Sequence, residues 1–160
     1  MSATDKKELR TFALWILFSE AVGITAGILT MNDTVIYSTE ITKPMLAPPP
    51  LIFPVVWTIL YALMGFGAAK IFLAPASKER TQGLRLFLAQ LFFNFCWCFL
   101  FFSAQAFGTA FLWLVILILL VAKMIITFRK ISPLASCIQV PYLLWLIFAG
   151  YLNFAVWLLN

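Results

Sequence analysis

The stretch Lys43–Gly67 reads KPMLAPPPLIFPVVWTILYALMGFG, and it decides how the rest of the chain is interpreted. It opens with a basic residue and a proline, and three consecutive prolines follow at Pro48–Pro50. Proline fixes its backbone angle and has no N–H to donate, so this part forms a stiff loop. After Pro54 the stretch becomes an apolar helix that carries Trp57 and Tyr61. We therefore expect a rigid loop that leads into a transmembrane helix and helps to wall a ligand pocket.

The composition of the whole chain is that of a membrane protein. Of its 160 residues 64% are hydrophobic and only 11% are charged, and the mean hydropathy is +1.02. A soluble domain carries about 25% charged residues. The apolar runs are continuous rather than alternating, which excludes a β-barrel pattern and leaves helices as the spanning structures. We expect an all-α membrane protein, a single domain over residues 1–160 that forms a bundle of five transmembrane helices.

Apolar runs of about 20 residues place these five helices. They cover about residues 11–30, 51–72, 86–103, 109–128 and 133–159. Residues 31–50 form the proline-rich loop, which we expect to act as a lid. Ser132 followed by Pro133 is typical of a helix start, and Pro141 should kink the last helix.

The basic residues gather on one side of the predicted bundle. Five spans place the two chain ends on opposite faces of the membrane. Ten of the 11 Lys and Arg residues then lie on the side of the N-terminus, and only Lys43 lies on the other. The positive-inside rule predicts a cytoplasmic N-terminus and an outer C-terminus. The short loops favour a bacterial cytoplasmic membrane, and basic clusters between apolar runs do not indicate nucleic-acid binding.

Residues for metal or hydrolytic chemistry are missing from the sequence. There is no histidine, and the three cysteines are Cys96, Cys98 and Cys137. Thiolates in lipid need partners, so we expect these cysteines to fill helix contacts rather than to hold a metal. Paired carboxylates, a nucleophile elbow and a glycine-rich phosphate loop are also missing. We expect no metal and no cofactor, and classical enzyme chemistry has little support.

Helical spacing places polar and aromatic side chains on three shared helix faces. These faces carry Trp57, Tyr61 and Met64; Gln90, Asn94, Trp97 and Phe101; and Tyr142, Trp145, Ala149 and Asn153. Amide side chains in lipid must face the bundle, because leaving their hydrogen bonds unmade is costly. The tryptophans beside them would line a pocket for a large, flat and largely apolar ligand. Plain helix packing is the alternative explanation of such aromatic stripes.

The first predicted helix carries two further features, the carboxylate of Glu20 and the pair Gly23-x-x-x-Gly27. A charge at membrane depth is costly and is a functional hypothesis by default. Glu20 is therefore a candidate proton or cation site, and the alternative is a protonated or interfacial side chain. The glycine spacing lets two helices approach closely, although it is a weak signal alone.

Four blocks of the sequence resemble the TspO/MBR family, whose members are called tryptophan-rich sensory protein, translocator protein or peripheral-type benzodiazepine receptor. The blocks are KPMLAPPPLIFPVVWTILYALMGFG at 43–67, FNFCWCFLFF at 93–102, ISPLA at 131–135 and PYLLWLIFAGYLN at 141–153. The resemblance implies a five-helix bundle, often dimeric, that binds porphyrins such as protoporphyrin IX. It also implies affinity for sterols and for synthetic benzodiazepine-type ligands.

The helix faces and the resemblance together name the expected ligand-binding residues. They are Pro48, Pro49, Trp57, Tyr61, Asn94, Trp97, Tyr142, Trp145 and Ala149. Trp57 and Trp145 match the family's pocket tryptophans, which the resemblance links to light-dependent porphyrin breakdown. Two departures reduce the aromatic surface of the lid. Tyr37-Ser38 stands where the family usually has Trp-Tyr, and Leu46 stands where it usually has Trp.

The sequence thus leads to a membrane receptor or carrier that binds porphyrin-like tetrapyrroles in stress sensing or tetrapyrrole handling. A proton-coupled small-molecule transporter that uses Glu20 is one alternative. Light-dependent porphyrin breakdown by Trp57 and Trp145 is another, and a structural helper that packs through Gly23 and Gly27 is a third. The expected partners are membrane lipid, an apolar small molecule and a second copy of the chain, with no nucleic acid.

Overall fold

The computed structural model describes the backbone of residues 3–160 and the side chains of residues 5–160, and within that range its only regular elements are helices, with no strand. Its elements are α1 (Ala3–Leu29), α2 (Met31–Glu40), α3 (Ile52–Leu73), α4 (Lys78–Cys98), the π-helical turn η1 (Phe99–Ser103), α5 (Phe107–Arg129), α6 (Pro133–Cys137) and α7 (Val140–Leu159). The first two residues of the chain, which the sequence assigns to the predicted domain, lie outside the described residues.

Five segments of the described chain are long and apolar enough to cross a membrane. They are Asp5–Leu29, Ile52–Leu73, Lys78–Ser103, Phe107–Arg129 and Pro133–Leu159. Each has at least 22 residues, which at 1.5 Å per residue exceeds the roughly 30 Å of a hydrocarbon core. The predicted all-α bundle of five transmembrane helices is confirmed.

Two helices occupy residues for which the sequence predicts a tail or a loop. α1 begins at Ala3 rather than at residue 11, because the Lys, Glu and Arg residues that precede its apolar run are themselves good helix formers. α2 takes up Met31–Glu40, so half of the predicted loop 31–50 is helical. This helix has no buried residue, and its sequence MNDTVIYSTE has no apolar run to reveal it. We call the remaining residues 41–51 the lid loop.

Two other helix boundaries also differ from the predicted ones. α4 begins at Lys78 rather than at residue 86, because the Ser77 hydroxyl accepts a hydrogen bond from the Arg80 N–H at 3.0 Å and caps the helix. The last predicted helix is divided between α6 and α7. Pro141 therefore lies in the first turn of α7, where proline is tolerated, and not in the interior of a kinked helix.

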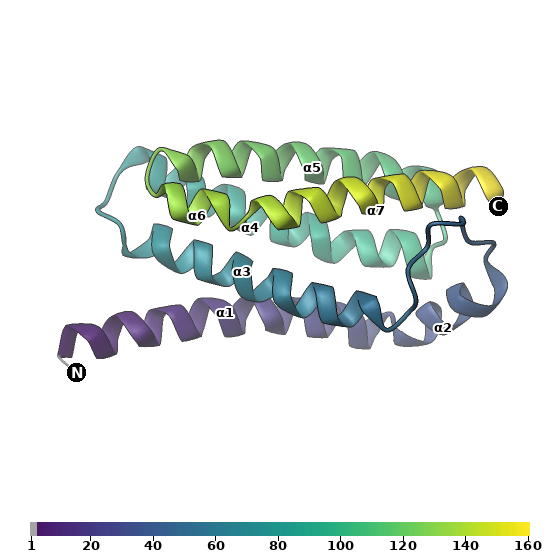
Figure 1. Ribbon diagram of the computed structural model, residues 1–160, viewed down its shortest axis with the longest axis horizontal. Coiled ribbons are helices and arrows are strands. Elements are labelled where there is room, and N and C mark those ends of the chain that lie inside the picture. Colours follow the sequence, from purple (N-terminus) through teal and green to yellow (C-terminus); the bar gives the residue numbers. More distant parts are fainter. Residues whose placement is uncertain (1–2) are drawn as a thin grey trace.

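The long helices lie lengthwise around a shared core (Figure 1). α1 packs along α3 and α4, α4 packs on α5, α5 packs on α6 and α7, and α3 closes the ring against α6 and α7. The most buried large side chains are Tyr142, Phe87, Phe128, Met64, Ile71, Leu114, Leu117, Met124 and Leu146.

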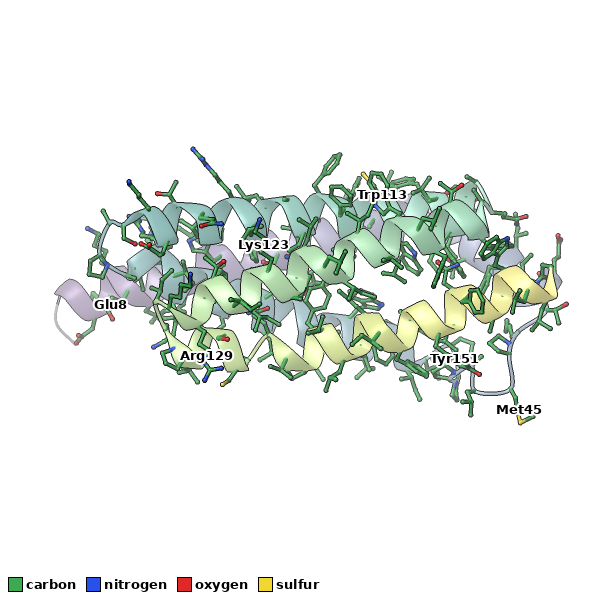
Figure 2. The ribbon with its side chains drawn as sticks, turned by 90° about the horizontal axis from the view of Figure 1, so that it is seen from above. Glu8, Met45, Trp113, Lys123, Arg129 and Tyr151 are labelled. Carbon is green, nitrogen blue, oxygen red and sulfur yellow. The ribbon has the colours of Figure 1, made fainter. Side chains whose placement is uncertain are left out.

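The two ends of the bundle differ in charge. Figure 1 shows the described N-terminus at one end and the C-terminus at the other, as an odd number of spans requires. The half of the bundle with the N-terminus, which we call the basic end, carries ten of the 11 Lys and Arg residues. The opposite end holds α2, the lid loop and Lys43. The side chains of Arg129 and Met45 mark the two ends in Figure 2.

Candidate functional site

A chain of buried hydrogen bonds connects three transmembrane helices. The Tyr61 hydroxyl on α3 donates to Asn94 Oδ1 on α4 at 2.8 Å. Asn94 Nδ2 donates to the Tyr142 hydroxyl on α7 at 2.8 Å, and that hydroxyl donates to Gln90 Oε1 at 2.8 Å. All four side chains are buried. Each buried polar group thereby meets the requirement for a partner in a medium without water.

Trp57 completes this group, one helical turn before Tyr61. Its ring centroid lies 5.5 Å from that of Tyr61 and 6.3 Å from that of Tyr142. We call Trp57, Tyr61, Gln90, Asn94 and Tyr142 the inner cluster. Four of its members are predicted site residues, so the structure brings together what helical spacing alone had suggested. Gln90 was assigned to the right helix face but was not among the predicted site residues.

Gly23 on α1 makes room for the inner cluster. A Cβ atom added to Gly23 would overlap the ring of Tyr61, so only glycine lets the ring lie against α1. Gly27, its predicted partner in the GxxxG pair, has open space around it and lies on the exposed side of α1. The two glycines therefore do not act together within the described chain.

Trp145 lies in a groove between α3 and α7 rather than in the inner cluster. The groove has a volume of about 450 Å³ and is lined by Val56, Ile59, Leu60, Leu63, Pro141, Leu144, Trp145 and Phe148. The ring of Trp145 lies 5.9 Å from that of Phe53 and 5.6 Å from that of Phe148. We call this the α3–α7 groove. Ala149, one turn further along α7, is half-buried against the core.

The α3–α7 groove and the inner cluster lie on different faces of the same two helices. Val56 and Leu60 of the groove alternate along α3 with Trp57 and Tyr61 of the inner cluster. On α7, Tyr142 of the inner cluster is followed by Leu144 and Trp145 of the groove. The groove opens outward on the membrane-spanning part of the bundle, where Ile59 and Leu144 of its lining are exposed.

A buried amide lies where α6 and α7 divide. The side chain of Gln139 is fully buried, and its Nε2 donates to the backbone carbonyl of Leu63 at 3.1 Å. A Cβ at Gly67 would overlap this side chain, so glycine allows the close approach. Its Oε1 has no hydrogen-bond partner among the described residues. The bond fixes the beginning of α7 to α3 at one end of the groove.

Trp97 belongs to a second aromatic group nearer the C-terminal end. Its Nε1 donates to Asn153 Oδ1 at 3.1 Å, and its ring stacks on Phe101 with centroids 4.9 Å apart. Asn153 Nδ2 donates to the Phe107 carbonyl at 2.8 Å. We call Trp97, Phe101, Phe107 and Asn153 the outer cluster. Trp97 thus packs both against the outer cluster and against the core on which Trp57 and Trp145 also pack.

Tyr37 of α2 covers the outer cluster. Its ring centroid lies 5.2 Å from that of Phe101, and Asp33 on the same helix accepts a hydrogen bond from Ser103 of η1. Burial raises the pKa of Tyr37 above its ordinary value, so its hydroxyl stays neutral at physiological pH. The cover is therefore α2, which sequence reasoning missed because this segment was read as loop.

Pro48 and Pro49 lie in the lid loop, just before α3. Pro48 is half-buried and Pro49 is exposed. The Pro49 carbonyl accepts a hydrogen bond from the N–H of Ile52 at 3.0 Å, at the start of α3.

Glu20 is half-buried within the α1 span, one turn before Gly23. Its carboxylate has no hydrogen bond and no ion pair to any side chain in residues 5–160. No group of His, Cys, Asp and Glu side chains that could hold a metal ion exists in the same residues. The arrangement therefore offers aromatic stacking surface, buried amides and one unpaired carboxylate.

Comparison of the amino-acid sequence with known proteins finds one matching family and several similar proteins. A family model described as "TspO/MBR family" matches residues 15–158. The chain is 36% identical over 155 residues to the tryptophan-rich protein TspO of Chlorobaculum tepidum, covering 96% of this chain and 98% of that protein. It is 39% identical over 120 residues to the translocator protein of Ovis aries, covering 74% and 71%. It is 33% identical over 153 residues to protein CrtK of Rhodobacter capsulatus, covering 95% and 94%.

Proposed function

Because this chain belongs to the TspO/MBR family, we propose that it is an integral membrane receptor or carrier for porphyrin-like tetrapyrroles such as protoporphyrin IX. Its cellular role would be stress sensing or tetrapyrrole handling. The basic end would face the cytoplasm of a bacterial cell, by the positive-inside rule. A homodimer is part of the proposal, and the open position of Gly27 would suit a contact between two copies.

The observation that carries the proposal is the α3–α7 groove beside the inner cluster. Its volume of about 450 Å³ lies within the range of about 300–1,000 Å³ that is typical of ligand sites. The walls are apolar, with the rings of Trp145 and Phe148 available to stack on a flat ligand. The buried hydrogen bonds that join α3 and α7 through Asn94 would hold the two helices in place and so keep the shape of the groove.

In this proposal Trp145 provides the main stacking surface. A flat ring system would lie in the groove against Trp145 while Trp57 and Tyr142 form the wall behind it. Pro48 and Pro49 would keep the lid loop stiff where it joins α3. Trp97 and Ala149 would affect ligand binding indirectly, by fixing the positions of α4 and α7.

The test is a titration of purified protein in detergent with protoporphyrin IX, in the dark, followed by porphyrin absorbance. We expect saturable binding that weakens about tenfold in Trp145→Leu, since stacking of aromatic rings contributes about 0.5–1.5 kcal/mol beyond area burial and 1.4 kcal/mol is tenfold. Trp157→Leu is the matched control, because Trp157 is exposed and packs on Phe111 and Phe154 instead. Equal losses in the two variants would argue against the groove.

One observation also favours light-dependent porphyrin breakdown. The ring of Trp57 lies against both Tyr61 and Tyr142, a contact of three oxidisable rings beside the groove. Illumination of the porphyrin complex should then produce a new absorbing product in the parent protein and not in Trp57→Phe. Binding without any spectral change under light would restrict the function to binding.

The unpaired carboxylate of Glu20 favours a proton-coupled transporter as the alternative function. A carboxylate in a transmembrane span with no hydrogen bond and no ion pair in residues 5–160 marks an ion or substrate pathway by default. Uptake into proteoliposomes that follows a pH gradient and disappears in Glu20→Gln would support this alternative. Uptake that is the same in both proteins would eliminate it.

A further inference from the structure

The lid loop exposes large apolar side chains where a water-facing loop would carry polar ones. Met45 is 99% exposed, Leu51 is 82% exposed and Leu46 is 62% exposed. No charged residue occurs between Lys43 and Lys70. Contiguous exposed apolar surface marks a site of contact with a partner or a membrane.

The loop also lies beside the transmembrane helices rather than beyond them. Its first part is fixed at the end of α7, where the Thr42 N–H donates to Asn160 Oδ1 at 3.0 Å and Asn160 Nδ2 donates to the Thr42 carbonyl at 3.1 Å. Figure 1 shows that α3 begins well short of this end and that the loop runs back along the bundle to reach it. The loop therefore shares its depth with the last turns of α7, a transmembrane span.

The apolar surface of the loop continues onto the bilayer-facing side of α3. Ile52, Val55 and Ile59 follow one another on one face of that helix, and all three are exposed. Figure 2 shows Met45 at the outer edge of the loop, pointing away from the helices. The surface that α3 presents to lipid thus extends without a charged interruption as far as Met45.

The backbone of the loop is also suited to an apolar medium. Four of its residues are prolines at positions 44, 48, 49 and 50, which have no N–H to leave unpaired. The N–H of Ala47 donates to the Pro44 carbonyl at 3.0 Å, and the N–H of Ile52 donates to the Pro49 carbonyl at 3.0 Å. Non-helical backbone is costly in a membrane because of its unmet donors, and four of the eight residues of Pro44–Leu51 have no donor to satisfy.

We propose that Pro44–Leu51 is inserted into the lipid leaflet opposite the basic end, with Met45 and Leu46 as its anchors. Lipid is the occupant that the surface fits, because the patch is continuous with the lipid-facing surface of α3 and carries no charge between Lys43 and Lys70. Lys43 marks the water boundary. Its Nζ donates to the Ser38 carbonyl at 2.7 Å and lies 5.8 Å from the ring centroid of Tyr37, which directs the charge back toward α2.

This inference goes beyond ligand binding and does not depend on which ligand the protein takes. It makes the lid loop a membrane element, held in the leaflet by its own side chains. A compound dissolved in the bilayer would meet the loop from the lipid side, without first crossing the aqueous phase.

The test places an environment-sensitive fluorophore on the loop of the full-length protein in liposomes. Met45→Cys is labelled with a nitrobenzoxadiazole maleimide in a Cys137→Ser background, which removes the exposed native thiol. Thr39→Cys is the matched control, because Thr39 is exposed on α2 at the same end of the bundle. Signal from the remaining thiols is measured on the Cys137→Ser parent and subtracted.

We expect a blue-shifted emission at position 45 that is quenched by phospholipid carrying a nitroxide on its acyl chain. The label at position 39 should emit as in water and be quenched by aqueous iodide instead. Water-like emission at position 45 would overturn the proposal. A blue shift that nitroxide lipid does not quench would also overturn it, because protein would then cover the loop. Leu51→Cys repeats the measurement with a second exposed residue of the same segment.

Discussion

Asn94 is the residue through which α3, α4 and α7 are joined by side chains. Both ends of its side-chain amide are used, since Oδ1 accepts from Tyr61 and Nδ2 donates to Tyr142. Hydrogen bonds between transmembrane helices contribute about 0.6 kcal/mol on average and up to about 1.7 kcal/mol. Because the four polar members of the inner cluster share one connected chain, the loss of one group leaves a buried partner unsatisfied.

Tyr61→Phe tests this chain at its first donor. The change removes only the hydroxyl and leaves Asn94 Oδ1 without a donor, so we expect a loss of about 1–2 kcal/mol in the free energy of unfolding. The measurement is reversible unfolding in mixed detergent followed by circular dichroism. Tyr151→Phe is the matched control, because Tyr151 is exposed and the structure describes no hydrogen bond from its hydroxyl. Similar losses in both variants would contradict the role given to the inner cluster.

At the scale of elements, Gly65 determines how closely the backbones of α1 and α3 approach. A Cβ added to Gly65 would lie 2.5 Å from the Ile16 Cα and 2.6 Å from the Trp15 carbonyl oxygen, which are backbone atoms and cannot move aside. Small residues at such positions let transmembrane helices approach closely. α1 is thereby held against α3 along the length that includes Glu20 and Gly23.

Gly65→Ala should therefore separate α1 from α3. We expect a loss of about 1–3 kcal/mol in the free energy of unfolding, as for other overpacked contacts. Gly27→Ala is the control, since the space around Gly27 is open and alanine is the better helix former by about 1 kcal/mol. Thermal unfolding of the two variants should thus move in opposite directions. A Gly65→Ala variant as stable as the parent would show that α1 and α3 pack less closely.

The elements also show what the sequence could and could not predict. Long apolar runs located all five spans, and Ser132 before Pro133 marked the start of α6, where the Ser132 hydroxyl accepts the Ala135 N–H at 3.2 Å. α2 was missed because its sequence lacks an apolar period. Its helical state is stabilised by tertiary contacts of Tyr37 and Asp33 with η1.

The candidate site was predictable only as far as helix faces go. Periodicity correctly grouped Trp57 with Tyr61 and Asn94 with Gln90, since each pair is one turn apart on one helix. It could not show that Trp145 faces the outward groove while Tyr142 faces inward. That distinction depends on how α7 is rotated about its own axis. The break between α6 and α7 at Gln139, and the contacts of α7 with α3 and α5, set this rotation.

For the whole molecule, the unequal charge of the two ends gives a test of orientation. Cys137 is exposed and lies in α6 at the basic end. If the basic end is cytoplasmic, a membrane-impermeant maleimide should label Cys137 in inverted vesicles and not in intact spheroplasts. The control is Ser38→Cys in a Cys137→Ser background, which should show the reverse, because Ser38 is exposed at the other end. Labelling of Cys137 in intact spheroplasts would invert the topology.

The central claim is that a flat apolar ligand occupies the α3–α7 groove, and a second groove of the molecule provides its control. That groove lies between α1 and α4, has a volume of about 400 Å³ and includes Leu88 in its lining. Leu144→Trp fills the first groove and Leu88→Trp the second, both at exposed leucines.

The most direct measurement is the dissociation constant of protoporphyrin IX for the two variants and the parent. We predict that Leu144→Trp weakens binding by about tenfold or more, a loss of about 1.4 kcal/mol, while Leu88→Trp binds like the parent. Equal affinity in all three proteins, or a loss confined to Leu88→Trp, would contradict the claim.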